Sequence, residues 1–182
     1  AEVIRAAARL KDLVNSWNKG VRFNQTVVLT GERPLRQDEN YEKCCQEIGI
    51  DTNADSAISS WESINPKTEA DMMKWMWENY PDMPDDMKKS ILFISDKQER
   101  PNTENTIIQW VKEEKPTPGS ILSSSGAPYG MAQDEALWMH LGELGFTIET
   151  FGHKAPDNLT AEQLIQEVVR CVHRIMKARL AA

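Results

Sequence analysis

The sequence predicts an α/β fold, a three-layer α/β/α sandwich with a mainly parallel, Rossmann-like sheet. Short runs of β-branched and apolar residues at 26–30, 90–95, 119–122 and 146–151 have the length and composition of buried strands. The segments between them carry apolar residues at three- and four-residue steps, which is the period of amphipathic helices. Strands that alternate with helices pair in parallel through right-handed crossovers, so the element order predicts a layered sheet.

The length and composition are those of one domain of ordinary size. The chain has 182 residues, of which 40% are hydrophobic, and this is enough to bury a substantial core. We therefore predict a single domain over 1–182. The polar and irregular sequence of 36–67 predicts an insertion or lid, with a helix over 40–48 and a weaker stretch around 57–64.

The first helix is expected over 3–17, with Gly20 just beyond it as a stop signal. The strand at 26–30 follows and is closed by Gly31. Because a helix precedes this first visible strand, we expect a further strand upstream of Ala1.

A strongly helical segment begins after Thr68, the expected N-cap. Glu69 and Asp71 give it an acidic first turn, which the helix dipole favours, and Pro81 ends it. Methionine and tryptophan residues at helical spacing fill 72–77. Such a stripe is typical of core packing rather than of a cofactor site.

The second half of the chain repeats the order of strand, exit loop and helix. Asn102 or Thr103 is expected to cap one helix, and the Ser-rich loop 123–130 precedes another over 133–144. Thr160 is expected to cap a long final helix. The apolar residues of that helix include Val168, Val169, Val172, Ile175 and Met176.

Charge and hydropathy exclude two classes of partner. The formal net charge is −7, and the basic residues are scattered singly among acids, so no surface for DNA or RNA is expected. The longest apolar runs fall far short of the roughly 20 residues that a membrane-spanning helix needs. A small anionic molecule is the expected partner, and a protein partner is the alternative.

The cysteines and histidines predict neither a disulfide framework nor a metal site. Cys44 and Cys45 are adjacent and Cys171 makes the count odd, which favours a reducing compartment and a cytoplasmic location. The histidines are isolated, and no CxxC pair occurs, so we predict no metal ligands.

The carboxyl ends of the predicted strands are the expected functional site, because ligands of open parallel sheets bind there beside helix N-termini. The loops 31–35, 96–105, 123–129 and 152–156 lie at these ends and carry two arginines, several polar caps and three serines. This set suits a phosphate, a carboxylate or a nucleotide. The predicted ligand contacts are Gly31, Arg33, Arg100, Asn102, Thr103, Asn105, Ser124, Ser125 and Tyr129.

Each of these residues also has a structural explanation. Asn102 and Thr103 are ordinary helix caps, and the serines could form a turn. Glu69 is the candidate general base, but the dipole alone favours an acid at a helix start. The sequence contains no Gly-x-Ser-x-Gly elbow, GxGxxG or P-loop motif, so the reaction class and the cofactor stay open.

The order of motifs resembles the YdcF/SanA/ElyC-like family over most of the chain. The resemblance rests on Leu-Thr-Gly-Glu-Arg-Pro-Leu at 29–35, Thr-Glu-Ala at 68–70, Arg-Pro-Asn-Thr-Glu-Asn-Thr at 100–106, and the serine-rich loop before a helix. It implies a Rossmann-like fold and a ligand site shared by Glu69-Ala70 and the Asn-Thr turn at 102–103. Members have been linked to envelope and lipid-carrier metabolism and, in one case, to binding S-adenosylmethionine.

The chain departs from the family pattern in two places. A glycine-rich first strand is absent, and the Thr-Ser-x-x-His-like loop of the family corresponds to 124–129, which has no histidine. The leading interpretation is therefore a protein that binds a small anionic or nucleotide-like ligand, as an uncharacterised transferase or hydrolase of envelope or metabolite chemistry. The alternative is a non-enzymatic protein-interaction module that uses the methionine- and tryptophan-rich segment 61–87.

Overall fold

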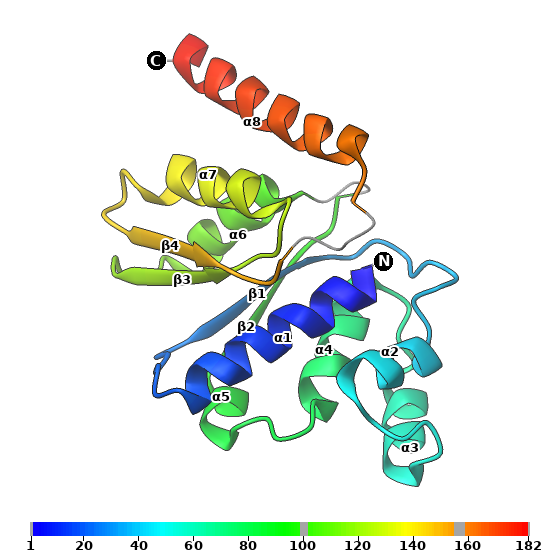
Figure 1. Cartoon of the computed structure of the whole chain (residues 1–182). Coiled ribbons are helices and arrows are strands. Elements are labelled where there is room, and N and C mark those ends of the chain that lie inside the picture. Colours follow the sequence, from blue (N-terminus) through cyan, green and yellow to red (C-terminus); the bar gives the residue numbers. More distant parts are fainter. Residues whose placement is uncertain (1, 99–101, 155–158, 182) are drawn as a thin grey trace. The chain divides into compact units, whose positions relative to one another are not determined.

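The computed structural model describes residues 2–98, 102–154 and 159–181. The chain divides into two compact units, Ala1–Glu113 and Glu114–Ala182. Figure 1 labels the helices and strands of both. Within the described residues there are eight helices and two parallel two-stranded sheets. The α/β class and the parallel pairing are therefore confirmed. The sheets are smaller than the continuous sheet of a three-layer sandwich.

The first unit is built on the parallel pair of β1 and β2. The two strands are in register from Thr26 opposite Ile91 to Gly31 opposite Asp96, so both carboxyl ends reach the same edge. The elements of this unit are α1 (Glu2–Asn18), β1 (Thr26–Gly31), α2 (Tyr41–Ile48), α3 (Asp55–Ile64), α4 (Glu69–Asn79), α5 (Asp85–Lys89), β2 (Ile91–Asp96) and α6 (Thr103–Glu114).

Helix α4 forms the centre of the hydrophobic core. Met72, Trp75 and Met76 are fully buried, and Trp77 is 2% exposed, which confirms that the Met/Trp stripe is core. Thr68 caps the helix as predicted, in a reciprocal capping box with Asp71. Other apolar side chains of the segment 61–87, among them Trp61, Ile64, Met73 and Tyr80, are partly buried against the same core.

The segment 36–67 contributes to this core through α2 and α3. Cys44 and Cys45 are fully buried and unlinked, and Ala57 is 3% exposed. Tyr41 and Trp61 contact Trp75 of α4 edge-on, with ring centroids 5.8 Å and 4.9 Å away. These contacts anchor both helices to α4 and hold the loop between β1 and α2 in place.

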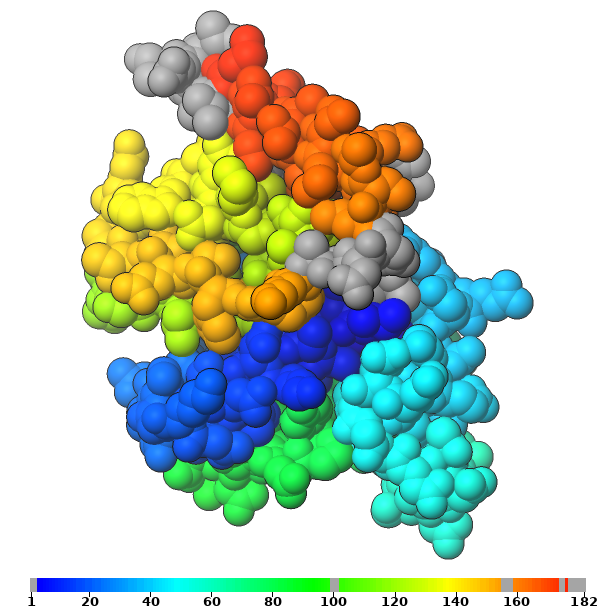
Figure 2. Space-filling model, in the orientation of Figure 1, coloured from blue at the N-terminus to red at the C-terminus, as the bar shows by residue number. Residues whose placement is uncertain are grey.

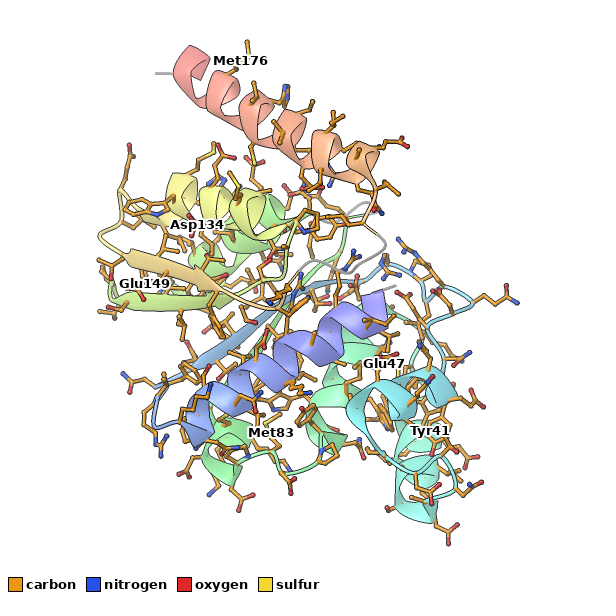
Figure 3. All side chains as sticks on the ribbon, viewed as in Figure 1. Tyr41, Glu47, Met83, Asp134, Glu149 and Met176 are labelled. Carbon is orange, nitrogen blue, oxygen red and sulfur yellow. The ribbon has the colours of Figure 1, made fainter. Side chains whose placement is uncertain are left out.

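The second unit is a parallel pair of strands covered by one helix. Its elements are β3 (Ser120–Ser124), α7 (Gly130–Leu141), β4 (Thr147–Phe151) and α8 (Ala161–Ala181). The strands are in register from Ser120 opposite Thr147 to Ser124 opposite Phe151, and α7 packs against β4 and α8. Asp134 of α7 points toward the strands, where its Oδ1 accepts a hydrogen bond of 2.7 Å from Thr150 of β4 (Figure 3).

Two local features differ from the sequence prediction. Helix α7 begins at Gly130 and ends at Leu141, each three residues earlier than predicted, and Gly145 closes the following turn with a φ of 87°. The short helix α5 was not predicted. Thr160 caps α8 as expected, accepting from the Gln163 backbone amide at 3.2 Å. None of the helices that the structure describes is both long and apolar enough to cross a membrane.

Candidate functional site

The loop that leaves β1 is fixed by an arginine held between two carboxylates. Arg33 donates from Nη1 and Nη2 to the two oxygens of Glu39, at 2.7 Å and 2.6 Å. Its Nε lies 3.0 Å from Oε2 of Glu69 at the start of α4. The fork of Arg33 is therefore already engaged by protein acids, although the sequence suggested it as a contact for a ligand anion.

Glu39 is the most deeply buried member of this group. Its side chain is 0% exposed, and Oε2 also accepts from the backbone amide of Arg36 at 2.8 Å. Burial raises the pKa of Glu39, but the Arg33 hydrogen bonds, the Arg36 amide and both positive charges outweigh it, so the pKa lies below its ordinary value. Glu39 therefore holds the loop as a carboxylate.

The backbone joins the same loop to the start of α4. Pro34 and Thr68 form an antiparallel bridge, the Leu35 amide donates to the Lys67 carbonyl at 3.1 Å, and the Glu69 amide donates to the Arg33 carbonyl at 3.0 Å. Glu69 is thus placed at the carboxyl end of β1.

Asp96 ends β2 directly beside Gly31. It is 4% exposed, its carbonyl accepts from the Glu32 amide at 3.0 Å, and its Oδ1 accepts from the Gln98 amide at 3.0 Å. The second oxygen, Oδ2, is buried and has no hydrogen-bond partner among the residues that the structure describes. Leaving a carboxylate oxygen buried without a donor is costly, so this atom marks the edge as a candidate binding position.

Polar side chains connect Asp96 to the start of α6. Asn105 Nδ2 donates to Oε1 of Gln98 at 2.8 Å, and the Asn105 amide donates to Oδ1 of Asn102 at 2.9 Å. Of the two predicted caps, Asn102 is therefore the one that caps α6, while Thr103 begins the helix. We refer to Gly31, Arg33, Glu69, Asp96, Asn102, Thr103 and Asn105 together as the β1–β2 edge.

The second unit has a separate group of polar residues at the ends of β3 and β4. The parallel pairing continues beyond the strands, because the Ser125 amide donates to the Phe151 carbonyl at 2.8 Å and the Ala127 amide donates to the His153 carbonyl at 3.2 Å. The hydroxyls of Ser124 and Ser125 are buried and have no hydrogen-bond partner within the described part of the chain.

His153 packs directly on the serine-rich loop. A Cβ added at Gly126 would lie 2.0 Å from Nε2 of His153, so only glycine allows the imidazole to approach this closely. Tyr129 precedes α7, and its backbone amide donates to the Gly126 carbonyl at 3.0 Å. The loop 124–129 contains no histidine of its own, but His153, which follows β4, lies against it.

The structure therefore groups the predicted residues in two sets. The β1–β2 edge contains those of the first unit, and Ser124, Ser125 and Tyr129 belong to the second. Arg100 lies outside the described residues. Sequence reasoning missed Glu39, Asp96 and His153 as individual site residues. Only Asp96 had a local signal, because it is the first acid after a buried strand.

Comparison of the chain with family models, with curated proteins and with solved structures found no match. The resemblance to the YdcF/SanA/ElyC-like family therefore stays a prediction that rests on its short motifs.

Loss of the Arg33 side chain should destabilise the first unit. We expect Arg33→Ala to lower the free energy of unfolding by about 3–5 kcal/mol, because Glu39 would remain buried without a cation. Chemical denaturation measures this. The double variant Arg33→Met/Glu39→Leu removes both charges, so its free energy of unfolding should fall by less than that of Arg33→Ala. Equal losses in the two variants would mean that the uncompensated carboxylate is not the cause.

The same pair predicts a pH dependence. The folded-state pKa of Glu39 is depressed, so its contribution to stability is full above the ordinary carboxyl value of 4.5 and is lost as the pH falls through the lower folded-state pKa. In Arg33→Ala the burial of Glu39 is no longer offset by the Arg33 hydrogen bonds and charge, so its folded-state pKa rises and this decline should become smaller or reverse. Melting temperatures of both proteins between pH 3 and 7 give the comparison. Parallel curves would contradict the assignment.

Asp96→Asn should leave the fold intact and stabilise it. The asparagine Oδ1 can keep the hydrogen bond from the Gln98 amide, while the buried charge is removed, so we expect a gain of about 1 kcal/mol. Urea denaturation of the purified variant measures the change. A loss of more than about 1 kcal/mol would mean that Asp96 serves the fold rather than a ligand.

Proposed function

We propose that the protein binds a small nucleotide-like ligand at the β1–β2 edge, with the ribose hydroxyls donating to Asp96. The observation that carries the proposal is the buried Oδ2 of Asp96, which lacks a donor among the described residues. A carboxylate at the end of a strand beside the first βα turn is also where Rossmann-like folds bind ribose hydroxyls. That parallel is an analogy of position, and it supports the proposal together with the chemistry of the carboxylate.

The charges at this edge favour hydroxyl donors over a bare anion at Asp96. Glu32, Glu69 and Asp96 lie at the two strand ends, and Arg33 is engaged by Glu39 and Glu69. A phosphate placed here would face carboxylates, whereas a sugar hydroxyl can donate to them. The phosphate of the ligand is therefore placed toward Asn102 and Thr103, where the first amides of α6 favour negative charge.

The proposal includes a Rossmann-like arrangement of the chain and the ligand site that the family resemblance implies. Binding has more support than catalysis, because the carboxylate of Glu69 is held by Arg33 rather than left to act as a base. A transferase or hydrolase activity of envelope or metabolite chemistry is the next step to examine once a ligand is identified. Glu69 is the first residue to substitute in that case.

Calorimetric titration tests the proposal directly. Adenosine, AMP and S-adenosylmethionine are the probes, and 2′,3′-dideoxyadenosine is the matched compound without ribose hydroxyls. We expect saturable binding that weakens about tenfold or more on loss of the hydroxyls or in Asp96→Asn, since a hydrogen bond to a charged group contributes about 1.5–3 kcal/mol.

Glu32→Gln is the control for charge. Glu32 is exposed at the same edge and its Oε1 accepts from Ser95 Oγ at 3.2 Å, so the variant removes one negative charge without touching Asp96. Its affinity should stay within about twofold of wild type. Equal affinity of wild type and Asp96→Asn, or undiminished binding of the dideoxy compound, would refute the role of Asp96.

A further inference from the structure

Helix α8 turns an apolar stripe away from the rest of its unit. Figure 2 shows the helix, in orange and red, at the surface, and Figure 3 shows Met176 extending from the side opposite α7. Among the side chains of α8 that the structure describes, six large apolar ones are between 47% and 62% exposed. They are Leu164, Ile165, Val168, Val169, Val172 and Met176.

The side of α8 that is covered carries a charged residue instead. Glu167 is 6% exposed and accepts a hydrogen bond from Nη1 of Arg170, one turn further along the helix. Helix α7 is the element of this unit that packs on α8. An amphipathic helix in a folded unit normally buries its apolar side. In α8 the apolar side is exposed to solvent, as is typical of a surface that binds a partner.

The charge of α8 is opposite to that of the remaining chain. The sequence of Ala161–Ala181 contains four basic and two acidic residues, a net charge of +2. Since the whole chain carries −7, the remaining residues carry −9. A partner for this helix must therefore accept aliphatic side chains and must favour positive charge.

We propose that α8 binds the surface of an anionic phospholipid membrane, lying in the plane of the interface with the Leu164–Met176 stripe among the acyl chains. Helices with an aliphatic stripe and a basic polar side bind such surfaces through buried apolar area and attraction to anionic headgroups. The stripe needs no groove, because a lipid surface adapts to a convex helix. Pairing of α8 with α8 of a second copy would bring two helices of charge +2 together, which disfavours self-association.

A single helix of this kind gives reversible binding, so the assay must report an equilibrium. The full chain is sedimented with vesicles of phosphatidylcholine alone and with vesicles that contain about 30% phosphatidylserine. We expect binding to the anionic vesicles that is at least about fivefold stronger than to the neutral ones and that weakens as salt is raised.

Two variants that each add one negative charge distinguish an effect at the apolar stripe from an effect of charge elsewhere on the helix. Val168→Asp places a carboxylate in the centre of the stripe, and Gln166→Asp places one at an exposed position outside it. Val168→Asp should lose about tenfold or more in vesicle binding, and Gln166→Asp should lose no more than about threefold. Circular dichroism and the melting temperature should be unchanged in both, because both positions are exposed.

Three results would overturn the proposal. One is an absence of vesicle binding, or equal binding to anionic and neutral vesicles. Another is a dimer in analytical ultracentrifugation that Val168→Asp dissociates, which would assign the stripe to a second copy. The third is a fall in melting temperature in Val168→Asp but not in Gln166→Asp without lipid, which would mean that the stripe is buried within the chain.

Discussion

Two hydrogen bonds from Arg33 to the buried carboxylate of Glu39 hold the loop that leaves β1, and the ion pair with Glu69 ties that loop to α4. The geometry of the β1–β2 edge depends on this arrangement. A fully buried carboxylate is tolerated only with a cation and further donors, and Arg33 with the Arg36 amide supplies both. Arg33 therefore stabilises the fold, and other groups at this edge are the candidates for ligand binding.

Asp96 shows the opposite balance. It is nearly as buried as Glu39, yet one of its oxygens has no donor in the described part of the chain. The unpaired oxygen of Asp96 therefore lowers the stability of the fold, whereas both oxygens of Glu39 accept hydrogen bonds. Such a local conflict with stability is typical of functional positions, where a ligand supplies the missing interaction. This contrast is the main reason to place a ligand at Asp96.

Local sequence signals predicted the elements better than the site. Thr68, Asn102 and Thr160 were correctly expected as caps, because capping depends on residues within one helical turn. The sequence offers no way to distinguish Glu39, the partner of Arg33, from the other acids of the polar segment, since tertiary packing decides which of them is buried. The period of α8 predicted an amphipathic helix, but only tertiary packing decides that Glu167 is covered while Val168 is exposed.

Mapping of backbone amide chemical shifts during a titration with AMP tests the ligand site most directly. We expect the largest changes to fall together at Gly31 and Glu32, at Gln98, and at Asn102 and Thr103, and to require at least about tenfold more AMP in Asp96→Asn. Changes confined to the loop of Ser124 and Ser125 and to His153 would instead place the ligand on the second unit and contradict the assignment to Asp96.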